Sequence, residues 1–165
     1  MRYVLLDRVI RLERGKNVLA LKNVSLAEDV FADHFVGFPV MPGALLIESA
    51  AQAGTVLIET SSGFEQKAML AMVEHAKFRA MVRPGDQLTI AVTVETWDKN
   101  YVRAQASIRV GERLVMDARL VFGLKNIDEF YPPKTRHLVD AVYDFWLKDV
   151  ELLGFPDALP GRTPV

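Results

Sequence analysis

The chain has 165 residues and a mass of 18.5 kDa, which is the size of a single domain. Its residues are 50% hydrophobic and 25% charged, a composition typical of a globular protein rather than a disordered chain. The net charge of -1 gives no electrostatic reason to expect nucleic acid or an anionic membrane as a partner. No cysteine is present, which excludes disulfides, zinc–thiolate sites and a cysteine nucleophile.

No targeting or membrane-spanning segment is predicted. The amino-terminal residues reach Asp7 too early for the apolar region of a signal peptide. The longest apolar stretch, residues 44–58, is interrupted by Glu48 and Gln52 and is shorter than the roughly 20 residues that a membrane span needs. We interpret this stretch as a buried helix and expect a cytoplasmic protein.

In chain order, residues 3–24 predict a β-hairpin, and residues 25–41 are irregular. Pro42 is expected at the first helical position of a helix that runs to about residue 60. Apolar and polar residues then alternate with a period of two, which is typical of antiparallel strands with one face on a core. These predicted strands lie within residues 68–78, 88–95, 101–110 and 116–122.

The helix is apolar on almost every side, so it should be enclosed rather than lie on a surface. An α+β fold, with one antiparallel sheet wrapped around one long buried helix, follows from this order of elements. A second helix is predicted over residues 135–153, in which Phe145 and Trp146 anchor it on the sheet or on another subunit. We therefore divide the chain into a main domain, residues 1–125, and a C-terminal helical extension, residues 126–165.

Two ionisable side chains are candidates for chemistry. Glu48 is the only ionisable residue between Pro42 and Ile58, where it would be either a neutral general acid or a structural carboxylate bonded to Gln52 or a loop N–H. His34 precedes the helix and is either a base or a structural loop residue. The N–H of Gly43 lies at the helix start, where it could stabilise an oxyanion or simply begin the helix.

The stretch from His34 to Gln52 carries a family resemblance. It contains a His followed by Phe-Val-Gly, a Pro-Gly pair, a Glu fourteen residues after the His, and a Gln four residues later. This order resembles the active-site signature of the 3-hydroxyacyl-acyl-carrier-protein dehydratases of type II fatty acid synthesis, and the resemblance covers about residues 3–124. Glu48 and Ala44 favour the dehydratase type over the related dehydratase/isomerase, which carries Asp and Cys there.

The resemblance implies the hotdog fold and a homodimer, or a hexamer of dimers, with His and Glu supplied to each site by different subunits. His34 would remove the proton at C2 of a 3-hydroxyacyl thioester, and the Gly43 N–H would hold the thioester carbonyl. Glu48, positioned by Gln52, would protonate or orient the departing 3-hydroxyl, directly or through water. Gly37 and Pro42 would support this geometry, and neither a metal nor an organic cofactor is required.

The substrate would be carried by acyl carrier protein or coenzyme A. Lys77, Arg79 and Arg83 form a basic group that would either dock an acidic carrier protein or be a solvated strand end.

Departures from the family pattern concern the substrate more than the chemistry. Val36 replaces a usual Pro, Met69 or Leu70 falls near an aromatic gating position, and Ala71-Met72 replaces a pair of small residues. Two rival functions stay open: a hotdog thioesterase, and a non-catalytic hotdog subunit that binds acyl carriers.

Overall fold

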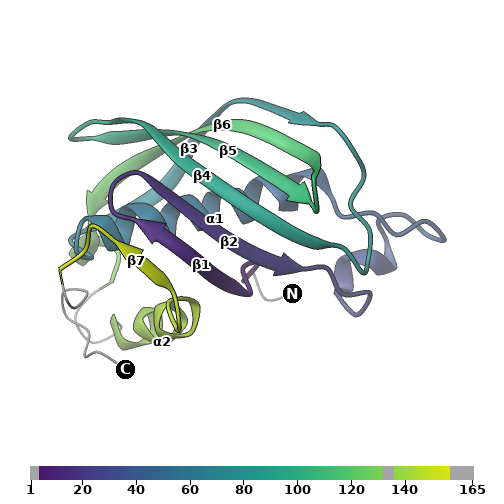
Figure 1. Ribbon diagram of the computed structural model, residues 1–165, viewed down its shortest axis with the longest axis horizontal. Coiled ribbons are helices and arrows are strands. Elements are labelled where there is room, and N and C mark those ends of the chain that lie inside the picture. Colours follow the sequence, from purple (N-terminus) through teal and green to yellow (C-terminus); the bar gives the residue numbers. More distant parts are fainter. Residues whose placement is uncertain (1–3, 132–135, 157–165) are drawn as a thin grey trace.

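One sheet curls around one central helix, with a short extension packed beside them (Figure 1). This computed structural model describes residues 4–131 and 136–156. Within these ranges the sheet has seven strands in the order β3-β6-β5-β4-β2-β1-β7. All neighbouring strands are antiparallel except β1 and β7. The strands are β1 (Arg8–Glu13), β2 (Asn17–Asn23), β3 (Gln66–Phe78), β4 (Gln87–Trp97), β5 (Tyr101–Val110), β6 (Arg113–Asn126) and β7 (Glu151–Leu153).

The central helix, α1 (Gly43–Ser61), is buried along most of its length, as its all-round apolar sequence predicts. Pro42 is the N-cap of α1, so the prediction that it occupies the first helical position is wrong by one residue. Its extended backbone, at φ -58° and ψ 136°, places its carbonyl to accept from the N–H groups of Leu45 and Leu46. Among the described helices, none is long and apolar enough to cross a membrane.

The predicted alternation of the strands is confirmed. On β5, for example, Val102, Ala104, Ala106 and Ile108 are buried against α1, while the residues between them are more exposed. The same period-two pattern continues on β4. Because one face of the sheet covers α1, this pattern fixes the register of each strand.

The two edges of the sheet differ. The short strand β7 covers the outer side of β1, whereas β3 pairs with β6 on one side and with no described strand on the other, which leaves that edge open among the described residues. An open edge normally invites pairing with another chain. The exposed large hydrophobic residues of β3 are Met69, Leu70, Met72, Val73 and Phe78.

The C-terminal segment differs from its prediction. Helix α2 (Arg136–Trp146) is shorter than the expected 135–153, and residues Glu151–Leu153 form β7 instead. Trp146 is buried and its Nε1–H donates to the Leu6 carbonyl at 2.9 Å, so it does anchor the helix. Phe145 is 63% exposed, so it does not anchor α2 on the sheet of this chain, and its contact with another subunit stays a prediction. Residue 135 and the end of the tail lie outside the described residues.

Candidate active site

His34 lies in the loop between the 3-10 helix η1 (Asp29–Ala32) and α1. Its backbone N–H donates to the Val30 carbonyl at 3.1 Å, and its own carbonyl accepts from the Val40 N–H at 3.1 Å. The ring Nδ1 is 2.8 Å from the Val40 carbonyl oxygen. Because a carbonyl can only accept, Nδ1 carries the proton, and Nε2 of the neutral ring is left with its lone pair.

A tight turn follows His34. The N–H of Phe35 donates to the Phe38 carbonyl at 3.1 Å, and the N–H of Phe38 donates back to the Phe35 carbonyl at 2.8 Å. Gly37 within this turn has φ +74°, a left-handed conformation that favours glycine. Val36 is exposed at the tip of the turn. The turn returns the chain to Val40, which holds the His34 ring.

His34 and Gly43 share one pocket of about 540 Å³. Within the described part of the chain, the Gly43 N–H donates to no protein atom, as expected at a helix start. A Cβ at position 43 would lie 2.7 Å from Cζ of Phe78, so any side chain there would push this ring out of the pocket wall. The pocket therefore combines an imidazole base with a free backbone donor. Its lining residues are His34, Val40, Met41, Gly43, Leu46, Phe78, Arg79, Ala80, Met81 and Val82.

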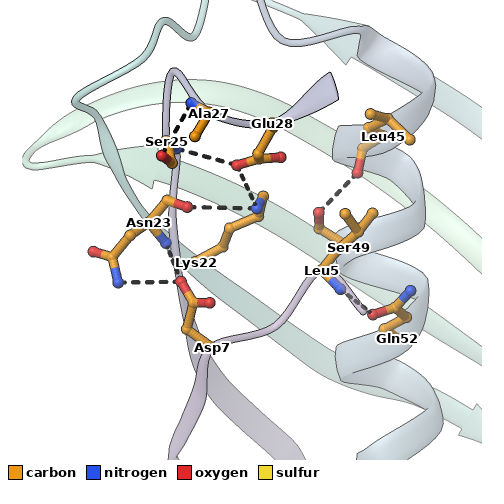
Figure 2. A network of polar contacts seen from close by, with 10 residues as sticks. All are labelled: Leu5, Asp7, Lys22, Asn23, Ser25, Ala27, Glu28, Leu45, Ser49 and Gln52. Carbon is orange, nitrogen blue, oxygen red and sulfur yellow. Dashed lines mark hydrogen bonds and ion pairs between the residues drawn. The ribbon is translucent and has the colours of Figure 1, made fainter. Parts of the chain in front are cut away.

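Glu48 is half-buried on α1 and is held by Gln52 one turn later. The Gln52 side-chain amide donates from Nε2 to Oε1 of Glu48 at 2.9 Å. The Gln52 side-chain oxygen, Oε1, accepts the Leu5 N–H at 2.9 Å, a bond that ties the segment before β1 to the helix (Figure 2). Since Leu5 can only donate, this bond fixes which end of the amide faces Glu48. Gln52 thus lies where a residue that positions the Glu48 carboxylate is expected.

The structure does not bring His34 and Glu48 into one pocket. Glu48 lines a second pocket, whose lining residues include none of those around His34. Positions 43 and 48 are five residues apart, which places them about 140° apart around a helix with 3.6 residues per turn. Within one chain, the base and the acid therefore face different sides of α1.

Another network fixes the loop that leads to His34. Lys22, at the end of β2, is buried, and its Nζ lies 3.0 Å from Oε1 of Glu28, which precedes η1 (Figure 2). The same carboxylate oxygen accepts the Ser25 N–H at 3.1 Å. These contacts tie the loop to the sheet and so determine where its far end, which carries His34, enters the site.

The predicted docking residues Lys77, Arg79 and Arg83 are all exposed, but Arg79 and Arg83 contact other side chains of this chain. Arg79 donates from Nε to Asp117, and the Arg83 guanidinium lies 4.7 Å from the centre of the Phe38 ring. The hydrogen bond from Arg79 is the main reason why the pKa of Asp117 is below its ordinary value. Arg79 also lines the His34 pocket, so this basic group borders the site.

A buried carboxylate that the sequence reasoning missed is Glu59, near the end of α1. It is 0% exposed. Its Oε1 lies 2.7 Å from Nζ of Lys67 and accepts the Ala68 N–H at 3.1 Å, while Oε2 accepts the Tyr143 hydroxyl. Glu59 follows Glu48 by eleven residues, about 20° from the same helix face. The polar residues Glu48, Gln52, Thr55 and Glu59 therefore follow one face of the helix, and this spacing in the sequence could have identified Glu59.

In residues 4–131 and 136–156, no group of three or more His, Asp or Glu side chains is placed to hold a metal ion.

An antiparallel sheet curled around one long helix defines the hotdog class of proteins, and solved structures share this architecture. The dehydratase heterocomplex ApeI:P from Xenorhabdus doucetiae matches with a TM-score of 0.61 and 19% identity, covering 85% of this chain and 90% of that one. The fluoroacetyl-CoA thioesterase FlK matches with a TM-score of 0.61 and 13% identity, covering 78% of this chain and 96% of that one. At such identities these likenesses show the fold alone.

The chain belongs to the FabA-like family, whose domain matches residues 1–119. The 3-hydroxyacyl-(acyl-carrier-protein) dehydratase FabZ of Pelotomaculum thermopropionicum is 40% identical over 124 residues, which are 74% of this chain and 89% of that protein. The corresponding dehydratase of Pediococcus pentosaceus is 44% identical over 118 residues, covering 71% and 79% of the two chains. These relatives confirm the resemblance predicted from the sequence.

Proposed function

We propose that this chain is an enzyme that removes water from 3-hydroxyacyl thioesters to give trans-2-enoyl thioesters in fatty acid or related acyl-chain synthesis. Relatives named as 3-hydroxyacyl-acyl-carrier-protein dehydratases match over most of their length and support this reaction. The single observation that carries it is the His34 pocket, where the imidazole that bonds the Val40 carbonyl through Nδ1 and the free Gly43 N–H occur together.

The elimination needs a base at C2 and an acid at the C3 hydroxyl. His34 Nε2 takes the C2 proton, and the electron pair of the C2–H bond forms the C2=C3 double bond. The Gly43 N–H donates to the thioester carbonyl oxygen while negative charge develops there. Glu48 gives its proton to the departing hydroxyl, which leaves as water, and the proton on His34 later returns to Glu48. Each positioned acid or base contributes about 10²–10⁴-fold to the rate.

Because His34 and Glu48 lie in separate pockets of one chain, a complete site needs a second copy. The open edge of β3 is the place for it: Met69 and Leu70 line the Glu48 pocket, and Phe78, at the other end of the same strand, lines the His34 pocket. Pairing of two β3 edges would bring the His34 pocket of one subunit to the Glu48 pocket of the other. We propose this homodimer as the catalytic unit, alone or as the building block of a hexamer.

We propose acyl carrier protein as the carrier and the cytoplasm as the location. The relatives are named for substrates on this carrier. Lys77 and Arg83, exposed near the His34 pocket, can attract an acidic protein, while Arg79 is already partly neutralised by Asp117. Surface charge of this kind mainly raises the rate of encounter. Coenzyme A thioesters are the alternative substrates.

A spectroscopic assay of crotonyl-thioester hydration, run on the carrier-protein and coenzyme A forms, tests the reaction. Glu48→Gln and His34→Ala are each expected to lower kcat by about 10²–10⁴-fold while the protein stays folded. Glu65→Gln, at an exposed carboxylate outside both pockets, is the matched control and should retain full activity. Release of free thiol without reversible hydration would indicate a thioesterase instead. A folded protein with neither activity would indicate a non-catalytic subunit.

Mixing the two inactive variants tests the shared site. A heterodimer of His34→Ala and Glu48→Gln chains contains one site in which both functional groups are intact. After unfolding and refolding of an equimolar mixture, about a quarter of the wild-type activity should return, because half of the dimers are mixed and each has one of two sites intact. If both groups of each site came from the same chain, the mixture would stay inactive.

A further inference from the structure

We propose that the C-terminal extension forms the end wall of the acyl pocket and limits the length of the acyl chain that the site accepts. This inference rests on the proposed function, since it assigns the Glu48 pocket to the acyl chain. The pocket has a volume of about 540 Å³, within the range of about 300–1,000 Å³ common for small-ligand sites.

The floor of the pocket is one face of α1. Glu48, Ala51, Gln52 and Thr55 line it in successive turns. With a rise of about 1.5 Å per residue, the distance along the helix from Glu48 to Thr55 is about 10 Å. An extended chain advances roughly 1.2 Å per covalent bond, so about eight bonds fit between the acid and the last floor residue.

Beyond Thr55, the pocket is closed by residues that contact Glu59. The next residue of the same helix face, Glu59, does not line the pocket, because Lys67 and Tyr143 bind its carboxylate. Lys67 and Tyr143 form part of the lining themselves. The Lys67 ammonium is also 5.3 Å from the centre of the Tyr131 ring, which holds a second aromatic residue at this end.

The rest of the end wall comes from residues beyond the main domain. Val142, Tyr143 and Trp146 of α2 line the pocket together with Tyr131. The Tyr143 and Trp146 rings meet edge to face at 5.7 Å, and both side chains are anchored by hydrogen bonds. Figure 1 shows α2 beside β7 and β1, and the bond from Tyr143 to Glu59 ties it to the C-terminal part of α1. A wall formed by these residues would limit how far an acyl chain can extend from Glu48 along the pocket.

Turnover of 3-hydroxyacyl thioesters with four to about sixteen carbons tests the wall. In the wild type, kcat/KM should fall about tenfold or more once the chain exceeds about eight carbons beyond C3. Val142→Ala, alone and combined with Tyr131→Ala, should remove most of this fall by opening the wall. Phe145→Ala is the matched control, because Phe145 is exposed on the same helix and does not line the pocket. An identical length profile in wild type and variants would refute the proposal.

A binding measurement separates this proposal from the catalytic one. Trp146 lies in the wall, so its fluorescence in a Trp97→Phe background reports pocket occupancy by saturated acyl-pantetheine thioesters of the same lengths. Affinity that falls beyond the same length, and recovers in Val142→Ala, would support the wall even if no dehydration is found. Equal affinity at all lengths, or no binding at any length, would overturn it. Retained circular dichroism of each variant excludes misfolding as the cause.

Discussion

The buried contact between Glu59 and Lys67 gives a sharp stability prediction. Lys67→Met would leave the fully buried Glu59 carboxylate with two neutral donors, the Ala68 N–H and the Tyr143 hydroxyl. Removing one partner of a buried ion pair costs about 3–5 kcal/mol, and since two donors remain we expect the lower end, about 3 kcal/mol. For a chain of this size, this equals a fall in Tm of roughly 6–12 °C.

Urea and thermal unfolding followed by circular dichroism, at one protomer concentration, measure this cost. Lys125→Met is the matched control, because Lys125 pairs with Lys67 across β6 and β3 but is exposed; it should change stability by less than about 0.5 kcal/mol. Glu59→Gln combined with Lys67→Met should recover most of the loss, since a neutral amide leaves no buried charge but can still bond the Ala68 N–H and the Tyr143 hydroxyl. If the double variant is less stable than Lys67→Met alone, the carboxylate is not the cause and the reasoning fails.

Three further predictions follow from local contacts. Gly54→Ala should destabilise the protein by about 1–3 kcal/mol in urea unfolding, despite the higher helix propensity of Ala, because a Cβ there would lie 2.4 Å from Cζ of the buried Phe122. Because Arg79 lowers the pKa of Asp117 below 3.8, its contribution to stability is present above that pH and is lost as the pH falls through the folded-state pKa. Melting curves of wild type and Arg79→Gln should therefore differ above pH about 4 and converge at lower pH. Met72→Lys on the open edge of β3 should raise the dimer dissociation constant about tenfold in sedimentation equilibrium, and no change would place the interface elsewhere.

The main fold was predictable because its signals are local. Each strand shows its buried face by alternation within a few residues, and α1 shows its enclosure by being apolar on every side. The end of α2 was not predictable in this way. No Gly or Pro follows Trp146 directly, yet the helix stops, Asp149 adopts φ +58°, and β7 pairs with β1 some 140 residues earlier in the chain. A contact so distant in sequence leaves no local pattern.

The candidate site was predictable only in part, for a similar reason. The spacing from His34 to Gln52 identified the residues, and the Gln52–Glu48 bond is one that a helical i, i+4 spacing allows. The separation of His34 from Glu48 depends on how the loop before α1 packs on the sheet, and the number of residues between them in the sequence does not predict that packing. Glu59 lies directly after the apolar stretch 44–58 and was not predicted as part of the site, although the helix period alone places it on the Glu48 face.

Tyr143 connects the stability of the extension to the shape of the pocket. Its hydroxyl binds Glu59, which holds α2 on the main domain, and its ring lines the pocket that begins at Glu48. A loss of activity in Tyr143→Ala would therefore be ambiguous, since it could come from a released helix or from an enlarged pocket. Tyr143→Phe removes only the hydrogen bond, whereas Val142→Ala removes only side-chain volume at a position without a polar group. If the extension both packs on the main domain and closes the acyl pocket, Tyr143→Phe should lower stability with little effect on chain-length preference. Val142→Ala should alter chain-length preference with little effect on stability.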